Sequence, residues 1–296
     1  DISDFTVEVD GRKYETDYES WCNSFGEPLT APYKLRKVIA NKEFSSSFHW
    51  ENGFLLDESE TVVIDSERRN IMEIPQGITV IGHFAFMMHD FKKLKLPDSL
   101  LTIGRYAFSD SVDPDFTEVF IPDSVKTIGK SAFCGCDLEK VHLPAHLESI
   151  PRGCFNYNWL LSIEFPLTLK HIGDEAFGGS EFEEIVLPEG VEDIGYNVFE
   201  GRDLHITLPS TLKEIAKDFY YEVCVDDPES CLPFIEVHPD NPYFYAENGT
   251  LYKRDDASSP YLGYTYPKPK IRSNPKLVKI KNHEKSIQII RPFGFG

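Results

Sequence analysis

The most regular feature of this sequence is a pattern of apolar positions that recurs about every 22 residues. In each unit an isoleucine precedes a phenylalanine by five places, and a small residue stands directly before the phenylalanine, as in Ile103, Ala107 and Phe108. Successive phenylalanines lie 22, 25, 22, 22 and 22 residues apart, and a seventh unit, Ile215 to Tyr220, follows after 21. A fixed period of this length predicts an array of stacked coils around one continuous core. The column consists of Phe86, Phe108, Phe133, Phe155, Phe177 and Phe199.

A second column marks where a short strand ends. An apolar residue followed by proline recurs in every unit, for example at Leu96-Pro97, and the residues before it alternate between apolar and polar types. Alternation predicts strands whose first and third side chains face the core while the middle one faces outward. Proline then ends the strand because it has no N–H to donate. Equal excursions between strands predict parallel stacking about 4.8 Å apart, with the phenylalanine rings in an internal stack.

Two stretches, Pro97–Phe108 and Pro122–Phe133, carry the pattern Pro-x-x-Leu-x-x-Ile-Gly-x-x-Ala-Phe nearly unbroken. This pattern resembles the BspA-like, or Treponema pallidum-type, leucine-rich repeats, and it covers about two thirds of the chain. The resemblance implies an α/β-type repeat solenoid, a right-handed leucine-rich-repeat superhelix with a parallel β-sheet, short helical or irregular turns, and inserted β-hairpins. The family often has cysteine three places after the phenylalanine. Here only Cys136 keeps it, and the other units have His89, Ser111, Asn158, Ser180 and Arg202.

Two segments outside the regular units are similar to each other. Residues 51–56 and 247–252 each contain Glu-Asn-Gly before apolar residues. Asn-Gly at such a place predicts a tight β-hairpin turn, because both residues tolerate positive φ. We interpret both segments as hairpins inserted in the array, as is common in BspA-like proteins, and a functional loop is the alternative. Residues 5–14 also predict a hairpin, turning at Asp10-Gly11, that caps the array.

These signals divide the chain into five parts. The parts are an N-terminal hairpin cap at 1–34, the first Asn-Gly island at 35–70, regular repeats at 71–239, the second island at 240–276 and the start of a further repeat at 277–296. In the last part, the apolar spacing of Ile287 to Phe295 matches that of Ile78 to Phe86. We therefore expect the sequence to stop inside an eighth unit.

The composition and net charge of the chain narrow the classes of partner that it can bind. With 41% hydrophobic residues, 22 Phe and 14 Tyr, the chain has ample material for a folded core. The net charge of −19 argues against a sequence-independent grip on nucleic acid, which needs a positive surface. From Lys253 onward ten Lys or Arg stand against three Asp or Glu. We interpret this basic segment as a solvated face or a self-complementary contact.

The hydropathy of the chain predicts no insertion into a membrane, because no run of 18 apolar residues and no leader is present. The opening Asp1-Ile2-Ser3, without Met, fits a processed chain. The lack of a leader is therefore no guide to the compartment.

The sequence contains few signals of catalytic, cofactor-binding or metal-binding residues. The nine histidines form no His-Glu-x-x-His pair and the six cysteines no Cys-x-x-Cys spacing, so we expect no metal site and no cofactor. Cys134-Gly135-Cys136 is the nearest approach to a redox pair, but Cys136 occupies the position where the family often has cysteine. We expect no catalytic residues.

Two further motifs lie toward the C-terminal end. Cys224 and Cys231 flank an acidic stretch, which predicts either a loop closed by a disulfide in an exported protein or two free thiols. Asn248-Gly249-Thr250 matches a glycosylation acceptor, which matters only in a eukaryotic secretory pathway. The turn that Asn-Gly predicts already explains this motif.

The strand face turned away from the core is the candidate partner-binding face. Phe120 and Val186 are apolar among charged neighbours, and interfaces favour apolar anchors with a polar rim, although scattered exposed apolar residues are also ordinary. The residues on this face are Lys93, Lys95, Glu118, Phe120, Lys140, His142, Ser162, Glu164, Glu184, Val186, His205 and Thr207.

These features favour a non-enzymatic binding scaffold that presents a repeated surface to a protein or glycan. The resemblance to BspA-like proteins implies adhesion and an extracellular or cell-surface location, in a bacterium. The alternative is a structural spacer that carries a neighbouring domain, and an enzyme of unrecognised type is a remote third.

Overall fold

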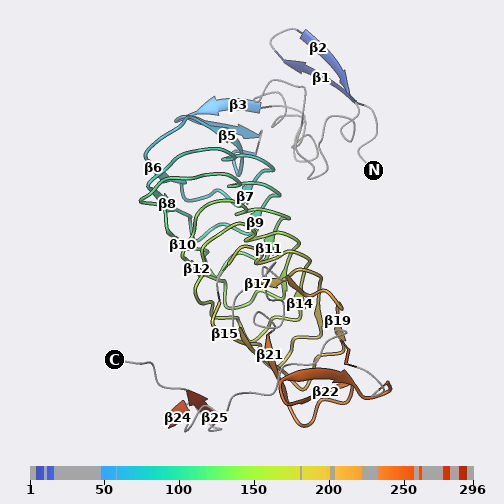
Figure 1. Cartoon of the computed structure of the whole chain (residues 1–296). Coiled ribbons are helices and arrows are strands. Elements are labelled where there is room, and N and C mark those ends of the chain that lie inside the picture. The colour runs from blue at the N-terminus through green and yellow to red at the C-terminus, as the bar shows by residue number, and fades with distance from the viewer. Residues whose placement is uncertain are drawn as a thin grey trace, which may run out of the picture.

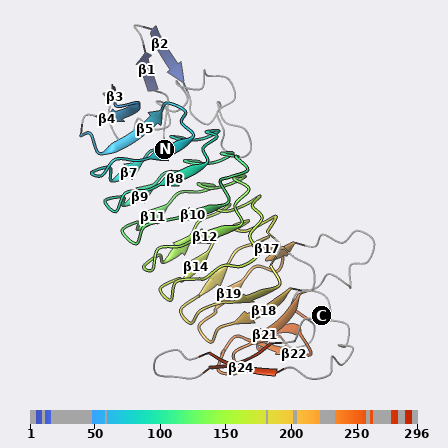
Figure 2. The ribbon, with the colours of Figure 1, turned by 90° about the vertical axis from the view of Figure 1, so that its left-hand side faces the viewer.

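A computed structural model of the chain shows an elongated stack of β-coils (Figures 1 and 2). Within the described residues every element is a strand, and turns connect the strands. The predicted solenoid with parallel strands is confirmed, and of the short helical or irregular turns that the resemblance implied, the described coils contain turns without a helix. The right-handed sense of the coil stays a prediction. The structure describes residues 5–9, 12–16, 48–57, 59–180, 182–200, 204–221, 233–256, 260–261, 276–280 and 287–291.

One side of the stack carries the strands that precede the apolar-Pro pairs, and we call it the first ladder. The strands pair in parallel and begin one residue earlier than the alternation predicted, so their middle residues face the core, as Val119 does beside Val141. Pairing joins β6 to β8, β10 to β12, and β15 to β18 and β21. The strands are β6 (Ile71–Glu73), β8 (Lys93–Lys95), β10 (Glu118–Phe120), β12 (Lys140–His142), β15 (Glu184–Val186), β18 (His205–Leu208) and β21 (Phe234–Val237).

The isoleucine column forms a second ladder, also parallel, where the sequence predicted one sheet. Each isoleucine is buried, and close packing of the coils follows from the glycine that comes next: a Cβ on Gly129 would lie 2.3 Å from the backbone N of Arg105. The strands are β5 (Val62–Ser66), β7 (Val80–Ile81), β9 (Thr102–Ile103), β11 (Thr127–Ile128), β13 (Ser149–Ile150), β14 (His171–Ile172), β16 (Asp193–Ile194) and β19 (Glu214–Ile215).

The core between the ladders contains the predicted phenylalanine stack. All six rings are fully buried, and successive ring centroids from Phe86 to Phe199 lie 5.2, 5.0, 5.7, 5.8 and 6.0 Å apart. Each buried ring contributes about 1.5–3 kcal/mol by area. In the seventh unit, β20 (Tyr220–Tyr221) pairs in parallel with β17 (Phe199–Glu200), which sets Tyr220 beside Phe199 in the backbone register. The fully buried ring of this unit is the neighbouring Phe219.

Both Asn-Gly segments form the predicted hairpins. β3 (Phe48–Glu51) pairs antiparallel with β4 (Phe54–Asp57), and β22 (Phe244–Glu247) with β23 (Thr250–Lys253). The first hairpin continues the second ladder, because β4 also pairs with β5, which is parallel to β7. The second hairpin meets the first ladder, where the Ile235 amide donates to the Gly249 carbonyl at 3.0 Å.

Two further hairpins lie toward the ends of the chain. β1 (Phe5–Val9) pairs antiparallel with β2 (Arg12–Thr16), as predicted, while their turn lies outside the described residues. β24 (Lys276–Ile280) and β25 (Ile287–Arg291) also pair antiparallel with each other. The start of a further repeat at 277–296 stays a prediction. The capping role of 1–34 and the division of the chain into five parts stay predictions.

Candidate binding surface

The first ladder places most of the twelve predicted face residues in two outward columns. Ten of the twelve lie in strands, and parallel register sets Glu118 beside Lys140 and Phe120 beside His142. Nine of the twelve are exposed, and His142, His205 and Thr207 are half-buried. Ser162 and Glu164 are exposed but belong to no strand. The alternation read from the sequence thus predicted the direction of these side chains, and their role in binding stays a prediction.

Phe120 is the centre of a packed cluster on this face. Its ring is 60% exposed and lies face to face with the His142 imidazole, with centroids 3.9 Å apart and planes inclined by 8°. His142 Nε2 lies 2.7 Å from Glu118 Oε1, and Lys140 Nζ lies 3.1 Å from the same oxygen. Hydrogen bonds from His142 and Lys140 lower the pKa of Glu118, so this carboxylate is charged at neutral pH. The cluster offers an apolar anchor surrounded by fixed charges.

Val186, the second predicted anchor, is 44% exposed and stands beside Thr207 in the register of β15 and β18. Further along the same face, His205 Nε2 lies 3.6 Å from Glu236 Oε2. The contact with His205 lowers the pKa of Glu236. The His205 ring also packs edge-on against Phe234, with centroids 5.1 Å apart and planes inclined by 89°. This end of the first ladder therefore combines apolar, aromatic and ionic groups.

Three large apolar side chains that the sequence did not single out are exposed on one coil. Tyr157, Trp159 and Leu161 alternate along one coil and are 65%, 57% and 64% exposed. They lie between β12 and β15, in the coil that contributes no strand to the first ladder. A signal was available, because the same repeat positions one unit earlier hold Gly135, Asp137 and Glu139.

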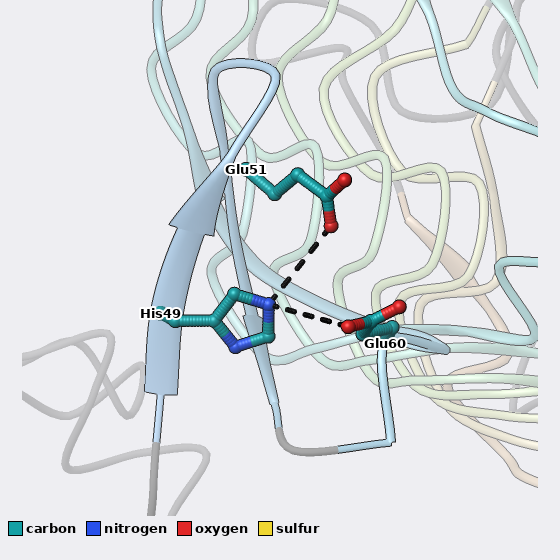
Figure 3. Close-up of side chains that lie close together, drawn as sticks. All are labelled: His49, Glu51 and Glu60. Atoms are coloured by element: carbon teal, nitrogen blue, oxygen red, sulfur yellow. Dashed lines mark ion pairs between the residues drawn. The ribbon is translucent and has the colours of Figure 1, made fainter.

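One group of potential metal ligands occurs within the described residues (Figure 3). His49 and Glu51 alternate on β3, and Glu60 comes from the turn after β4. His49 Nε2 lies 4.0 Å from Glu51 Oε2 and 3.9 Å from Glu60 Oε1, and all three residues are exposed. The pairing of the imidazole with both carboxylates accounts for the arrangement. The absence of a metal site stays a prediction.

Two of the three described cysteines are poorly suited to nucleophilic chemistry. Cys136 and Cys154 are fully buried in the core, and burial raises the pKa of both thiols. Their thiolates are therefore scarce at neutral pH, and the thiolate is the reactive form. Cys134, Cys136 and Cys154 form no disulfide with another described residue. The predicted disulfide between Cys224 and Cys231 lies outside the described residues.

A hollow of about 730 Å³ lies beside the second ladder, near the second hairpin. Its charged lining is mixed and largely neutralised locally: Arg152 pairs with Glu175 at 3.3 Å and Lys213 with Glu192 at 2.7 Å. It is therefore a weaker candidate for ligand binding than the exposed groups of the first ladder and of its interrupted coil.

Comparison with known families decides the class of the repeat. The model of the BspA type leucine-rich repeat region matches residues 66–114 and 111–225, in six copies. The chain belongs to the BspA-type leucine-rich repeat family. The region that matches the BspA-type model includes the phenylalanine stack, most of both ladders and the Phe120 cluster. A search among curated proteins gives no match.

This BspA-type chain is similar to several solved bacterial structures. A leucine-rich repeat protein from Bacteroides ovatus is 21% identical, over 65% of this chain and 75% of that one, with a TM-score of 0.35. The pneumococcal vaccine antigen PcpA is 18% identical, over 71% of this chain and 55% of that one, with a TM-score of 0.42. A leucine rich cell surface protein from Faecalibacterium prausnitzii is 16% identical, over 58% of this chain and 73% of that one, with a TM-score of 0.30. The chain spans little more than half the length of PcpA.

No helix in the described part of this chain has the length and apolar character needed to cross a membrane.

Proposed function

We propose that this BspA-type chain is a non-enzymatic binding scaffold, located at the surface of a bacterial cell or secreted, that presents the first ladder to a protein or glycan. The observation that carries the proposal is the Phe120 cluster. A phenylalanine that is 60% exposed on a regular sheet, and held against His142 within a network of charges, has the character of an interface anchor with a polar rim.

Preorganisation supports the same function. Ladder hydrogen bonds fix the backbone under Phe120, and the Glu118 pairings at 2.7 and 3.1 Å hold the side chains around it. A partner that meets a fixed surface loses less conformational entropy in ordering it, so more of the contact energy becomes affinity. A repeat sheet with regularly spaced outward side chains therefore suits recognition of an extended surface.

The adhesive part of the proposed function is supported by membership of the family. BspA-like proteins are associated with adhesion to host matrix components and to other cells, and the extracellular location follows from the same resemblance. The buried, high-pKa thiols Cys136 and Cys154 agree with a non-catalytic role. A spacer that carries a neighbouring domain is the rival proposal, and it expects no ligand for the ladder.

The test measures binding of the chain to immobilised matrix proteins and to a glycan array. Phe120→Asp places a charge in the centre of the surface, and we expect it to weaken binding by about tenfold or more. Val186→Asp tests the second anchor. Leu101→Asp is the matched control, because Leu101 is 41% exposed but adjoins the second ladder. Binding that survives both ladder variants would refute the surface, and a wild-type chain that binds nothing would favour the spacer.

A further inference from the structure

The coil between β12 and β15 exposes apolar surface that its neighbours do not. Tyr157, Trp159 and Leu161 point outward with 57–65% of their surface accessible, and their places in the preceding unit hold Gly135, Asp137 and Glu139. Within the described residues no backbone hydrogen bond joins Leu161–Phe165 to β12 or β15. We call these three side chains, exposed at alternate positions of one coil, the patch; exposed apolar groups rimmed by polar ones mark interaction sites.

Acidic side chains occupy the positions that correspond to Leu161 in the units on either side. The preceding unit has Glu139 and the following unit has Glu183, and both are exposed. Neither carboxylate forms a salt bridge with another described residue. Lys140, next to Glu139 in the sequence, is already paired with Glu118 at 3.1 Å. These two carboxylates therefore have no salt-bridge partner among the described residues, on a chain whose net charge is −19.

One contact orients the largest ring of the patch. Trp159 Nε1 donates to Asp137 Oδ1 at 3.0 Å, and the Trp159 amide donates to the Leu138 carbonyl at 2.9 Å. Trp159 is thus hydrogen-bonded to the neighbouring coil through both its backbone amide and its ring nitrogen. Its ring remains more than half exposed, and a carboxylate lies beside it.

Aromatic faces next to carboxylates are complementary in charge to a cationic side chain. A guanidinium or ammonium is attracted to the face of Trp or Tyr, and a nearby carboxylate adds a charge-assisted hydrogen bond. The methylene stems of arginine and lysine cover apolar surface such as that of Leu161. An acidic glycan would be repelled by the carboxylates, and a neutral glycan would gain nothing from their charge.

We propose that Tyr157, Trp159 and Leu161, with the carboxylates of the units on either side, form a docking site for an arginine- and lysine-rich segment of a partner protein. This site goes beyond the proposed function, because it uses none of the Phe120 or Val186 surface. The two sites can therefore fail independently.

The test titrates the full chain with a nona-arginine peptide and, as probes of the other charge classes, a nona-glutamate peptide and a neutral glucose hexasaccharide. We expect only the arginine peptide to bind, and its affinity to fall steeply between about 0.05 M and 0.5 M NaCl because screening weakens the contact. Trp159→Ala should reduce the affinity by about threefold to thirtyfold, the range for loss of a cation–π contact. Glu139→Gln and Glu183→Gln together should reduce it further.

Leu167→Ala is the matched control, since Leu167 is 81% exposed on the same coil but follows Pro166 and lies outside the patch. Phe120→Asp should leave binding of the arginine peptide intact. Equal affinity of the wild type and Trp159→Ala, or binding of the neutral sugar alone, would overturn the proposal. Self-association lost in Trp159→Ala would also overturn it, by making a second copy of this chain the partner. Unchanged thermal unfolding of each variant verifies its fold.

Discussion

At the scale of the residue, the position three places after each phenylalanine is the most informative. Ser111 Oγ, Cys136 Sγ and Asn158 Nδ2 each donate to the carbonyl of the phenylalanine in the preceding coil, at 2.8, 3.0 and 2.8 Å. All three residues are buried. A buried carbonyl without a partner costs free energy, so these three units need a short hydrogen-bond donor rather than cysteine as such. In the next unit, Ser180 Oγ donates to the Asn158 carbonyl at 3.4 Å instead.

Replacing Asn158 by alanine tests this requirement. Asn158 Nδ2 donates to the Phe133 carbonyl at 2.8 Å, and its Oδ1 accepts from the Leu138 amide at 2.9 Å. Asn158→Ala leaves both groups unpaired in the core, and we expect the free energy of unfolding to fall by about 2–4 kcal/mol. Urea unfolding measures the change. Asn158→Cys should lose less, because a thiol reaches the equivalent carbonyl from Cys136, and equal losses for the two variants would contradict the argument.

At the scale of the element, the two Asn-Gly hairpins share one turn in two environments. Asn52 and Gly53 have φ of 48° and 81°, and Asn248 and Gly249 have φ of 53° and 80°. Positive φ at both central residues is the geometry of a two-residue turn whose twist matches the strands. Local sequence therefore sets the turn, and tertiary packing sets how much change each turn tolerates.

Alanine substitutions at the two glycines separate these contributions. Both substitutions impose a left-handed conformation on a residue with a Cβ, which costs about 1–2 kcal/mol. At Gly249 the Cβ would also lie 2.4 Å from Phe234 Cδ2, whereas at Gly53 it meets the flexible end of Arg69. We expect Gly249→Ala to lower the free energy of unfolding by about 2–4 kcal/mol and Gly53→Ala by about 1–2 kcal/mol.

Thermal and urea unfolding of the two single variants give the comparison. A double variant, Gly249→Ala with Phe234→Ala, is the control, because removing the ring should bring the cost of the added Cβ down to that at Gly53. A Gly53 variant less stable than the Gly249 variant would show that ring packing is not the deciding factor.

At the scale of the whole molecule, charge is organised between coils. On the second ladder, Glu148 pairs with Lys170 at 3.0 Å and Glu192 with Lys213 at 2.7 Å, each one repeat apart. These exposed pairs contribute little individually, but they oppose the repulsion expected from a net charge of −19. Their contribution depends on pH through the carboxylates.

Glu192 allows the pH dependence to be measured. The hydrogen bond from Lys213 lowers the pKa of Glu192 below the ordinary value of 4.5. Since the folded pKa is the lower one, the pair stabilises the fold above the unfolded pKa, and this stability is lost as pH falls through the folded pKa. Urea midpoints of the wild type and Glu192→Gln should differ at about pH 6, and the difference should shrink as the pH is lowered toward about pH 3. An equal difference in urea midpoint at both pH values would refute this linkage. High salt should reduce the difference at about pH 6, because it screens the ion pair.

The sequence by itself determined the repeat, its period, the buried phenylalanine column and the outward direction of residues such as Phe120 and Glu118. Those features follow from alternation and spacing, which are properties of a short stretch of chain. The hairpin turns at Asn52 and Asn248 were predictable for the same reason, because the φ preference of Asn-Gly is local.

Only the tertiary structure decided what depends on the stacking of one coil on another. It showed a second parallel ladder, since residues such as Thr102 and Thr127 become strands only by pairing between coils. It also placed Trp159 on an interrupted coil beside Asp137, and gave the donor at Asn158 its carbonyl. Each of these contacts joins residues about one repeat apart, and no local pattern determines whether the space beside a side chain holds solvent or a neighbouring coil.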